Sequence, residues 1–242
     1  VMAPAFWWRP RGSGGLAARL LAPASWLWRL GARVRAMRAD AVRAPVPVIC
    51  IGNLTAGGAG KTPMVAALLR RLAARGVEAA VVSRGHGGRL AGPHRVDIAT
   101  DSAADVGDEA LLHAALAPTF VARDRAAGVQ AAAEAGAPLV LLDDGFQNPT
   151  VAKDAAILMV DAAQGFGNGR VIPAGPLREP VDEGLARADA AVLVGEPAAW
   201  ARCLAEWPEL AAARPVTARL VPLETGMTLA GEDVLAFAGI GR

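Results

Sequence analysis

The chain has 242 residues, of which 53% are hydrophobic, and a formal net charge of +2. This length and composition suit one large α/β domain, or one domain with part of another, around a sizeable apolar core. No run of about 18 or more residues is free of charge, so we predict no transmembrane helix. Cys50 and Cys203 lack the spacing of a disulfide framework, which indicates a reducing compartment.

The first 45 residues are strongly basic. Residues 1–45 contain eight arginines and one acid, a net charge of +7, whereas the remaining 17 basic and 22 acidic residues leave −5. Four of the six tryptophans lie in the same segment: Trp7, Trp8, Trp26 and Trp28. Arginines among aromatics suit an anionic membrane surface, but a helix that packs on its own domain explains them equally well. No nucleic-acid motif follows, so we predict no nucleic-acid partner.

Along the rest of the chain, apolar runs alternate with stretches at helical spacing. Apolar runs typical of strands lie at 46–51, 77–83, 119–122, 138–145 and 155–161. Helices are expected after residue 60, ending at Gly76, and at 107–116 and 125–136. A Gly/Pro-rich loop covers 162–180, and 183–242 continue the alternation more weakly. This order predicts an α/β fold with a doubly wound, mostly parallel sheet and ligands at the carboxyl ends of its strands.

The stretch CIGNLTAGGAGKTP, residues 50–63, has the order strand, glycine-rich turn and Lys-Thr that builds a P-loop. Its glycines let backbone N–H groups close around phosphate oxygens, Lys61 can reach the β- and γ-phosphates, and Thr62 can hold Mg²⁺. Thr55 stands where the usual pattern has its first glycine, and an ordinary strand-to-helix turn is the alternative interpretation. The predicted nucleotide-binding residues are Thr55, Ala56, Gly57, Gly58, Ala59, Gly60, Lys61 and Thr62.

Two adjacent acids, Asp143 and Asp144, follow the apolar run LVLL. An acid at the end of a buried strand is the expected partner of a P-loop, because it can reach the magnesium ion. Adjacent carboxylates at a strand end are costly unless a cation compensates them. The alternative is a turn with capping aspartates.

Together, several motifs resemble the tetraacyldisaccharide 4′-kinase family of lipid A biosynthesis. They are GNLTAGGAGKTP, SRGHG, VGDE, DDGFQ and GFGNGRVIPAGPLREP, in this order, and the resemblance runs from the Trp/Arg-rich N-terminus to the last residues, FAGIGR. It implies a P-loop NTPase-type fold with an N-terminal amphipathic helix. It also implies a kinase that uses ATP and Mg²⁺ to phosphorylate the 4′-hydroxyl of a lipid-linked glucosamine disaccharide 1-phosphate. The implied location is the cytoplasmic face of the inner membrane, with the lipid substrate and the membrane surface as partners; no motif indicates a protein partner.

The resemblance also implies roles for individual residues. Asp108 of GDE would take the proton of the acceptor hydroxyl, and Lys61 would act on the phosphates, although GDE read alone could equally be a helix start. The implied magnesium residues are Thr62, Glu109, Asp143 and Asp144. Substrate contacts are expected from Ser83, Arg84, Arg123, Arg125, Gln147, Asn168 and Arg170. Arginine binds phosphate bidentately, although any of these arginines could instead form a structural ion pair.

Three departures from the family pattern affect these expectations. His86 stands where we expect a tyrosine, and residues 148–150, Asn-Pro-Thr, stand where histidines are usual. The family continues beyond Arg242 into a stretch with a histidine that pairs with the catalytic acid. We therefore expect three parts: a membrane-surface segment at 1–45, a P-loop kinase core at 46–182, and the start of an incomplete C-terminal lobe at 183–242.

Two other functions remain open on the sequence alone. GGAGKT is compatible with a membrane-associated P-loop ATPase that switches a partner by its nucleotide state. The departures at the chain end are compatible with a nucleotide-binding remnant without catalysis.

Overall fold

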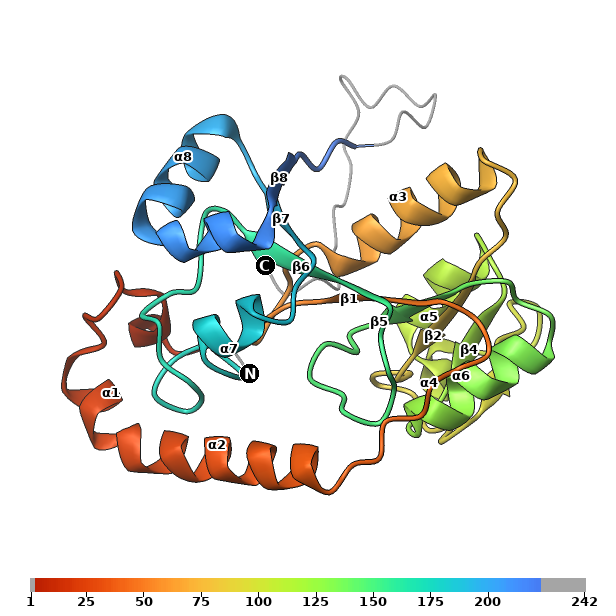
Figure 1. The fold of residues 1–242 in the computed structure, drawn as a ribbon, viewed down its shortest axis with the longest axis horizontal. Helices are drawn as coiled ribbons and strands as arrows, with labels where there is room; N and C mark the ends of the chain where they lie inside the picture. The colour runs from red at the N-terminus through yellow and green to blue at the C-terminus, as the bar shows by residue number, and fades with distance from the viewer. Residues whose placement is uncertain (1–2, 223–242) are drawn as a thin grey trace, which may run out of the picture.

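The computed structural model describes residues 3–222 and contains an eight-stranded sheet at its centre (Figure 1). The strands are β1 (Val48–Gly52), β2 (Ala80–Ser83), β3 (His94–Arg95), β4 (Thr119–Val121), β5 (Val140–Asp143), β6 (Ala155–Asp161), β7 (Ala190–Val194) and β8 (Pro215–Ala218). Their spatial order is β3-β4-β2-β5-β1-β6-β7-β8. Only the β3–β4 pair is antiparallel among these strands. The predicted doubly wound, mostly parallel sheet is confirmed.

Helices cover both faces of the sheet, and the alternation of side chains along each strand explains why. In β1, Cys50 belongs to the core on one face and Ile51 to the core on the other. Helix α3 (Lys61–Ala73) covers the Ile51 face with Val65 and Leu69. The other face is covered by α6 (Arg125–Glu134), α7 (Val181–Leu185), α8 (Pro197–Glu206) and the 3-10 helix η2 (Pro208–Ala213). Both faces are therefore buried, as the continuous apolar runs predicted.

The helix expected at 107–116 is present as α5 (Asp108–Ala114). A short helix that was not predicted, α4 (Ala103–Val106), comes immediately before it, and Gly107 joins the two. Gly107 has φ +86°, a conformation that favours glycine. A Cβ on Gly107 would lie 2.4 Å from the carbonyl oxygen of His86. The glycine thus lets the SRGHG loop approach the start of α5, which brings two of the sequence motifs together.

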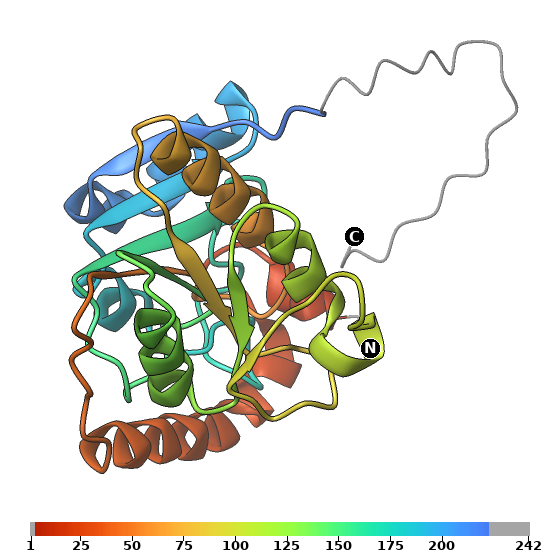
Figure 2. The same ribbon diagram turned by 90° about the vertical axis from the view of Figure 1, so that its right-hand side faces the viewer.

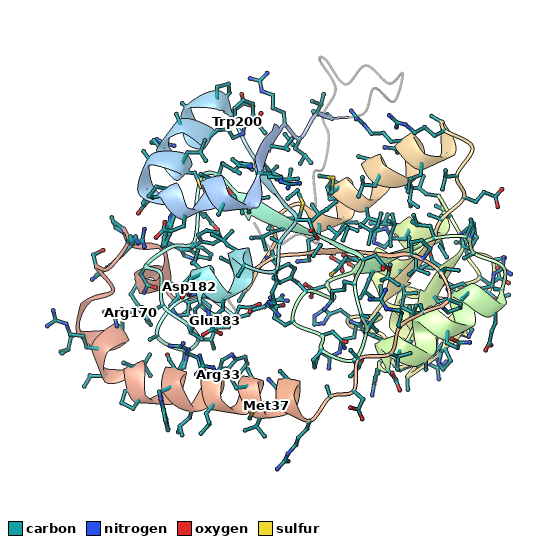
Figure 3. The ribbon with its side chains drawn as sticks, in the orientation of Figure 1. Arg33, Met37, Arg170, Asp182, Glu183 and Trp200 are labelled. Atoms are coloured by element: carbon teal, nitrogen blue, oxygen red, sulfur yellow. The ribbon has the colours of Figure 1, made fainter. Side chains whose placement is uncertain are left out.

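The N-terminal segment forms two short helical pieces and one long helix instead of a single helix. They are the 3-10 helix η1 (Ala5–Trp8), α1 (Gly15–Leu20) and α2 (Ala22–Met37). Helix α2 runs along the outside of the molecule, next to α7 and the loop that precedes it (Figures 1 and 2). Arg29 and Arg33 of α2 both pair with Glu183 of α7; Figure 3 labels Arg33 and Glu183. The predicted N-terminal helix is present, and it packs on its own domain through these pairs.

No helix within residues 3–222 has the length and apolar character needed to cross a membrane. Of the predicted C-terminal part at 183–242, the structure describes α7, β7, α8, η2 and β8. Residues 223–242 lie outside the described residues.

Candidate nucleotide and acceptor site

The P-loop is shaped by one buried asparagine. β1 ends at Gly52 and α3 begins at Lys61, so the glycine-rich turn lies at the carboxyl end of the sheet, as predicted. Asn53 donates hydrogen bonds from Nδ2 to the carbonyl oxygens of Thr55 (2.8 Å) and Gly57 (3.2 Å). Its Oδ1 accepts one from Nζ of Lys61 at 3.1 Å. Asn53 therefore fixes both the loop backbone and the lysine that we expect to reach phosphate.

Beside the loop, Asp144 lies between two cations. Nη1 of Arg178 donates to Oδ1 of Asp144 at 2.9 Å, and Nζ of Lys61 lies 3.6 Å from the same oxygen. Burial alone would raise the pKa of Asp144, but the charges of Lys61 and Arg178 outweigh it and hold this pKa below its usual range. Asp144 is thus ionised in the pH range of most enzymes, as a magnesium ligand must be.

Gln147 joins this cluster to the following loop. Its Nε2 donates to the carbonyl oxygen of Asn53 at 2.9 Å and to Glu179 at 3.0 Å. Its Oε1 accepts from Nη1 of Arg178 at 3.2 Å. In this structure Gln147 holds the P-loop and Arg178 together; its predicted contact with substrate stays a prediction.

Asp143 and Asp144 do not share one environment, although they are adjacent. The Asp143 side chain is buried, and its Oδ2 lies 3.0 Å from Nε2 of His113, which is 1% exposed. The other oxygen, Oδ1, is buried without a hydrogen-bond partner among the described residues. The structure thus gives Asp143 a partner that sequence reasoning missed, while its role toward Mg²⁺ stays a prediction.

The other predicted magnesium residues meet across two helix starts. Thr62, in the first turn of α3, donates from Oγ1 to Oε1 of Glu109 in the first turn of α5, at 3.3 Å. Together with Asp144, these side chains offer only oxygen atoms as metal ligands, and Mg²⁺ prefers oxygen ligands. Within residues 3–222, no three histidine, cysteine, aspartate or glutamate side chains gather as a preformed metal cage. This fits an ion held by one or two carboxylates together with substrate phosphates.

A cationic cavity of about 300 Å³ lies beside the start of α5. It is lined by Arg84, Gly85, His86, Gly87, Gly88 and Arg123. Asp108 begins α5, and within the described part of the chain its Oδ1 accepts only from the N–H of Glu109, at 2.9 Å. The backbone of Gly107, the residue before Asp108, packs against that of His86 in the cavity lining. The predicted acceptor residues Arg84 and Arg123 are thus brought together on one surface.

Ser83 and Arg125 lie beneath this surface. Oγ of Ser83 accepts from the N–H of Gly85 at 3.1 Å, which shapes the SRGHG loop. Arg125 is only 5% exposed and donates to the carbonyl oxygen of Ala122. Burial lowers the pKa of Arg125, and the positive charge of Arg84 lowers it further. Both residues support the cavity here, and their direct contact with substrate stays a prediction.

Asn168 and Arg170 lie against the N-terminal segment. Nδ2 of Asn168 donates to the carbonyl oxygens of Phe6 (3.1 Å) and Ala174 (2.9 Å), and its Oδ1 accepts from the N–H of Arg170. These bonds use the amide fully and bury it, so a structural role accounts for Asn168. The predicted substrate contacts of both residues are untested.

Sequence reasoning missed three residues of the site: Asn53, His113 and Arg178. Arg178 belongs to the quoted motif GPLREP, and Asn53 to GNLT, so both lay inside signals already recognised. His113 carried no signal of its own, because its partner Asp143 is 30 residues away.

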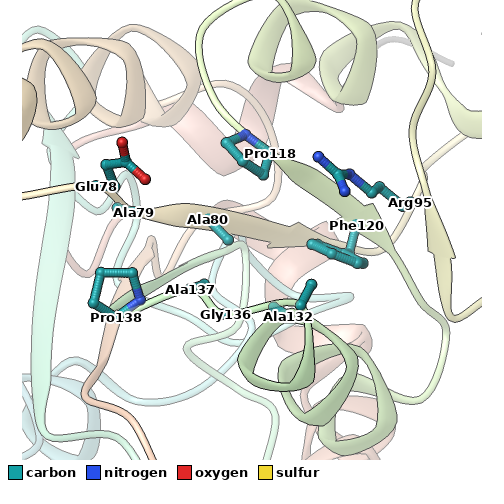
Figure 4. A pocket seen from close by; sticks show the side chains of 11 residues that line it. Glu78, Ala79, Ala80, Arg95, Pro118, Phe120, Ala132, Gly136, Ala137 and Pro138 are labelled. Carbon is teal, nitrogen blue, oxygen red and sulfur yellow. The ribbon is translucent and has the colours of Figure 1, made fainter.

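A second, smaller cavity lies away from this site. It has a volume of about 70 Å³ and is lined mainly by alanine and proline, with Glu78 and Arg95 at its rim (Figure 4). Ala80 at the start of β2 and Pro138 just before β5 line it. It therefore opens at the amino ends of these strands, the opposite edge from the P-loop.

Comparisons with known proteins show which family the chain belongs to. A family model described as tetraacyldisaccharide-1-P 4′-kinase matches residues 17–242. The chain belongs to this family. It is 57% identical over 240 residues to the tetraacyldisaccharide 4′-kinase of Dinoroseobacter shibae, and 56% identical over 246 residues to that of Rhodospirillum centenum. These alignments cover 99% and 100% of this chain, and 71% of each relative.

A solved structure agrees with this assignment. The crystal structure of LpxK from Aquifex aeolicus in complex with ATP is 32% identical, with a TM-score of 0.64 over 74% of this chain and 59% of that one. The family resemblance seen in the motifs is confirmed. The predicted lipid A kinase function is the one that the family and its named relatives support.

Proposed function

We propose that this protein transfers the γ-phosphate of ATP to the 4′-hydroxyl of a lipid-linked disaccharide 1-phosphate. One observation carries the proposal: besides the Lys61–Asp144–Arg178 cluster at the P-loop, the chain has a cationic cavity of about 300 Å³, and its His86 packs against Gly107 at the start of α5. A nucleotide switch would need the first feature but not the second.

On the nucleotide side, the P-loop N–H groups and the α3 N-terminus bind the phosphates, and Lys61 and Arg178 neutralise charge that develops on the transferred group. Thr62, Glu109 and Asp144 would hold Mg²⁺, and Asp143 is the remaining candidate ligand. When bound, Mg²⁺ offsets the negative charge of the β- and γ-phosphates.

On the acceptor side, Asp108 takes the proton of the attacking hydroxyl. Its carboxylate is suited to this because its only hydrogen-bond donor in the described residues is the adjacent N–H of Glu109. Arg84 and Arg123 attract the sugar phosphate to the cavity between them. Positioning the hydroxyl in line with the γ-phosphate supplies much of the rate enhancement.

The N-terminal segment brings the protein to the cytoplasmic face of the inner membrane. Several apolar side chains of α1 and α2 are exposed: Leu16, Leu20, Trp26, Leu27, Leu30 and Met37. Arg19, Arg35 and Arg38 form no ion pair within residues 3–222, unlike Arg29 and Arg33. Apolar side chains with free cations nearby suit an anionic lipid surface.

Membrane binding is tested best by substitution, because deleting the segment would also remove its contacts with the loop before α7. Changing Leu20, Leu27 and Met37 to serine should greatly reduce cosedimentation with vesicles that contain anionic lipids. MgATP affinity should stay the same. Unchanged vesicle binding would show that these helices serve packing alone.

The activity is tested with radiolabelled ATP and a disaccharide 1-phosphate lipid, using this chain beside one extended to the length of its relatives. Label that appears on the 4′-position supports the kinase. ATP hydrolysis that ignores the acceptor in both chains would indicate a nucleotide switch instead. MgATP binding without turnover in both chains would indicate a nucleotide-binding remnant.

A further inference from the structure

The backbone of residues 174–178, which we call the strip, lies between the P-loop and α2. On one side, the N–H of Arg178 donates to the carbonyl oxygen of Leu54 (2.7 Å), and the N–H of Ala56 donates to that of Pro176 (2.7 Å). Thr55 and Leu177 form an antiparallel bridge between these bonds. The strip is therefore joined to the P-loop by backbone hydrogen bonds, so a movement of the strip also moves the P-loop.

On its other side, the strip is held by two side chains of α2. Oγ of Ser25 accepts from the N–H of Ala174 at 3.1 Å and donates to the carbonyl oxygen of Val171 at 2.7 Å. Nε1 of Trp28 donates to the carbonyl oxygen of Arg178 at 3.0 Å. Helix α2 itself is fixed to α7 by the pairs of Arg29 and Arg33 with Glu183 (Figure 3).

The two hydrogen bonds of the Arg178 backbone thus come from different parts of the molecule. Its N–H is bound by the P-loop and its carbonyl by Trp28, while its guanidinium reaches Asp144 and Gln147. Trp28 is 43% exposed, so more than half of its surface is buried. To the Arg178 backbone it adds one directed N–H.

We propose that Trp28 is a positioning residue for the reaction: its indole N–H holds the backbone of Arg178 so that the guanidinium meets Asp144 and the nucleotide phosphates. This rests on the proposed phosphate-binding role of Arg178. It connects the helix that carries the exposed apolar side chains to the arginine of the phosphate site, while Ser25 holds the start of the same strip. A phosphate-binding arginine that is about 1 Å out of place loses much of its effect, so the constraint acts on function and not only on stability.

The chain offers a matched control in Trp26, two residues earlier on α2. It is 62% exposed, and its indole forms no hydrogen bond within the described part of the chain. Trp26→Phe and Trp28→Phe both remove one indole N–H from the same helix and keep an aromatic ring. Any shared effect on folding or on lipid contact appears in both variants, and a positioning effect appears only in Trp28→Phe.

The experiment measures the dissociation constant for MgATP by calorimetry, and the melting temperature without nucleotide, in a double-mutant cycle with Arg178→Ala. We expect Trp28→Phe to weaken MgATP binding about three- to tenfold, the range for loss of one hydrogen bond, and Trp26→Phe to change it by less than about twofold. Arg178→Ala should weaken binding at least about tenfold. In that background, Trp28→Phe should add less than about twofold, because the group it positions is gone.

Two results would overturn the inference alone. One is equal MgATP affinity of Trp28→Phe and Trp26→Phe while Arg178→Ala is defective; the other is a Trp28→Phe effect that persists in full beside Arg178→Ala. If Arg178→Ala binds MgATP like the unchanged chain, the proposed role of Arg178 fails first, and this inference fails with it. Glu183→Gln, which loosens α2 through Arg29 and Arg33, is a second variant; its defect should likewise disappear beside Arg178→Ala.

Discussion

The nucleotide side and the acceptor side of the site differ in how their polar groups are satisfied. On the nucleotide side, Asn53, Lys61, Asp144, Gln147 and Arg178 already bond to one another. On the acceptor side, the Arg84 and His86 side chains form no hydrogen bond or ion pair within residues 3–222, and Arg123 makes one long contact, 3.4 Å, to the Arg89 carbonyl oxygen.

This difference indicates how each half works. Charges that hold one another in place before the nucleotide arrives need little reorganisation during the reaction. Cations without protein partners keep their full attraction for an incoming phosphate, and they leave specificity to the shape of the cavity. Substitutions should therefore affect the two sides differently, and four of them test the comparison.

The largest effect should come from Asp108→Ala on the acceptor side. If Asp108 takes the proton, kcat of a chain extended to the length of its relatives should fall by roughly 10²–10⁴-fold, with MgATP affinity nearly unchanged. Steady-state kinetics with the lipid acceptor and separate nucleotide titrations measure the two effects. Asp182→Ala, at another acid in the first turn of a helix, is the control and should keep kcat. Equal kcat in both variants would mean that Asp108 has no catalytic role and that GDE only begins a helix.

The second effect concerns the buried pair of His113, in α5, and Asp143, at the end of β5. His113→Leu would leave the Asp143 carboxylate buried without the one side-chain partner that it has within residues 3–222, which should cost about 3 kcal/mol of unfolding free energy. Chemical denaturation measures this cost. Adding Asp143→Leu should recover most of the stability, since an apolar pair needs no hydrogen bonds, but it should not recover any lost transfer activity. A His113→Leu chain as stable as the unchanged one would mean that the pair contributes nothing.

Other contacts of the site, like this pair, show what the sequence could predict and what it could not. Strands, helices and the P-loop follow from apolar runs and a glycine-rich turn, signals that lie within a few residues of one another. The contacts of Arg178 with Asp144 and of Trp28 with Arg178 join residues 34 and 150 positions apart. No local pattern encodes such pairs, because they exist only after the sheet has placed its loops.

The N-terminal segment illustrates the same limit. Its arginines and tryptophans left a membrane-surface helix and a packing helix equally open. Composition could not separate the arginines that pair with Glu183 from those without an ion pair within residues 3–222. The division depends on where α7 lies. Likewise, Asn168 belongs to a family motif, but its amide is used in holding the N-terminal segment.

The third effect is loss of the P-loop lysine. Lys61→Ala removes the charge aimed at the β- and γ-phosphates, while Asn53 still shapes the loop and Arg178 still pairs with Asp144. MgATP affinity should fall at least about tenfold, since hydrogen bonds to charged groups are strong. Calorimetric titration measures it, with Arg71→Ala, an exposed cation of the same helix, as the control. If both variants bind MgATP equally well, the P-loop assignment is wrong.

The smallest effect should appear in the acid stability of the nucleotide side. Asp144 has a lowered pKa in the folded chain because Lys61 and Arg178 outweigh its burial, so its ionised form stabilises the fold. That contribution is complete above the pKa of an unfolded aspartate, about 3.9, and is lost as the pH falls through the lower folded pKa. Denaturant unfolding without nucleotide or metal should therefore show a stability difference between the unchanged chain and Asp144→Asn that is constant near neutral pH and shrinks below about pH 4.

The control for this prediction is Asp105, on the acceptor side. Ser102 and Arg89 lower the pKa of Asp105 to about 2, so the stability difference between the unchanged chain and Asp105→Asn should likewise shrink as the pH falls. Adding Arg178→Ala should weaken the pH dependence of Asp144 and leave that of Asp105 unchanged. If it alters both or neither, Arg178 does not set the charge state of Asp144, and the nucleotide side is less tightly coupled than its contacts indicate.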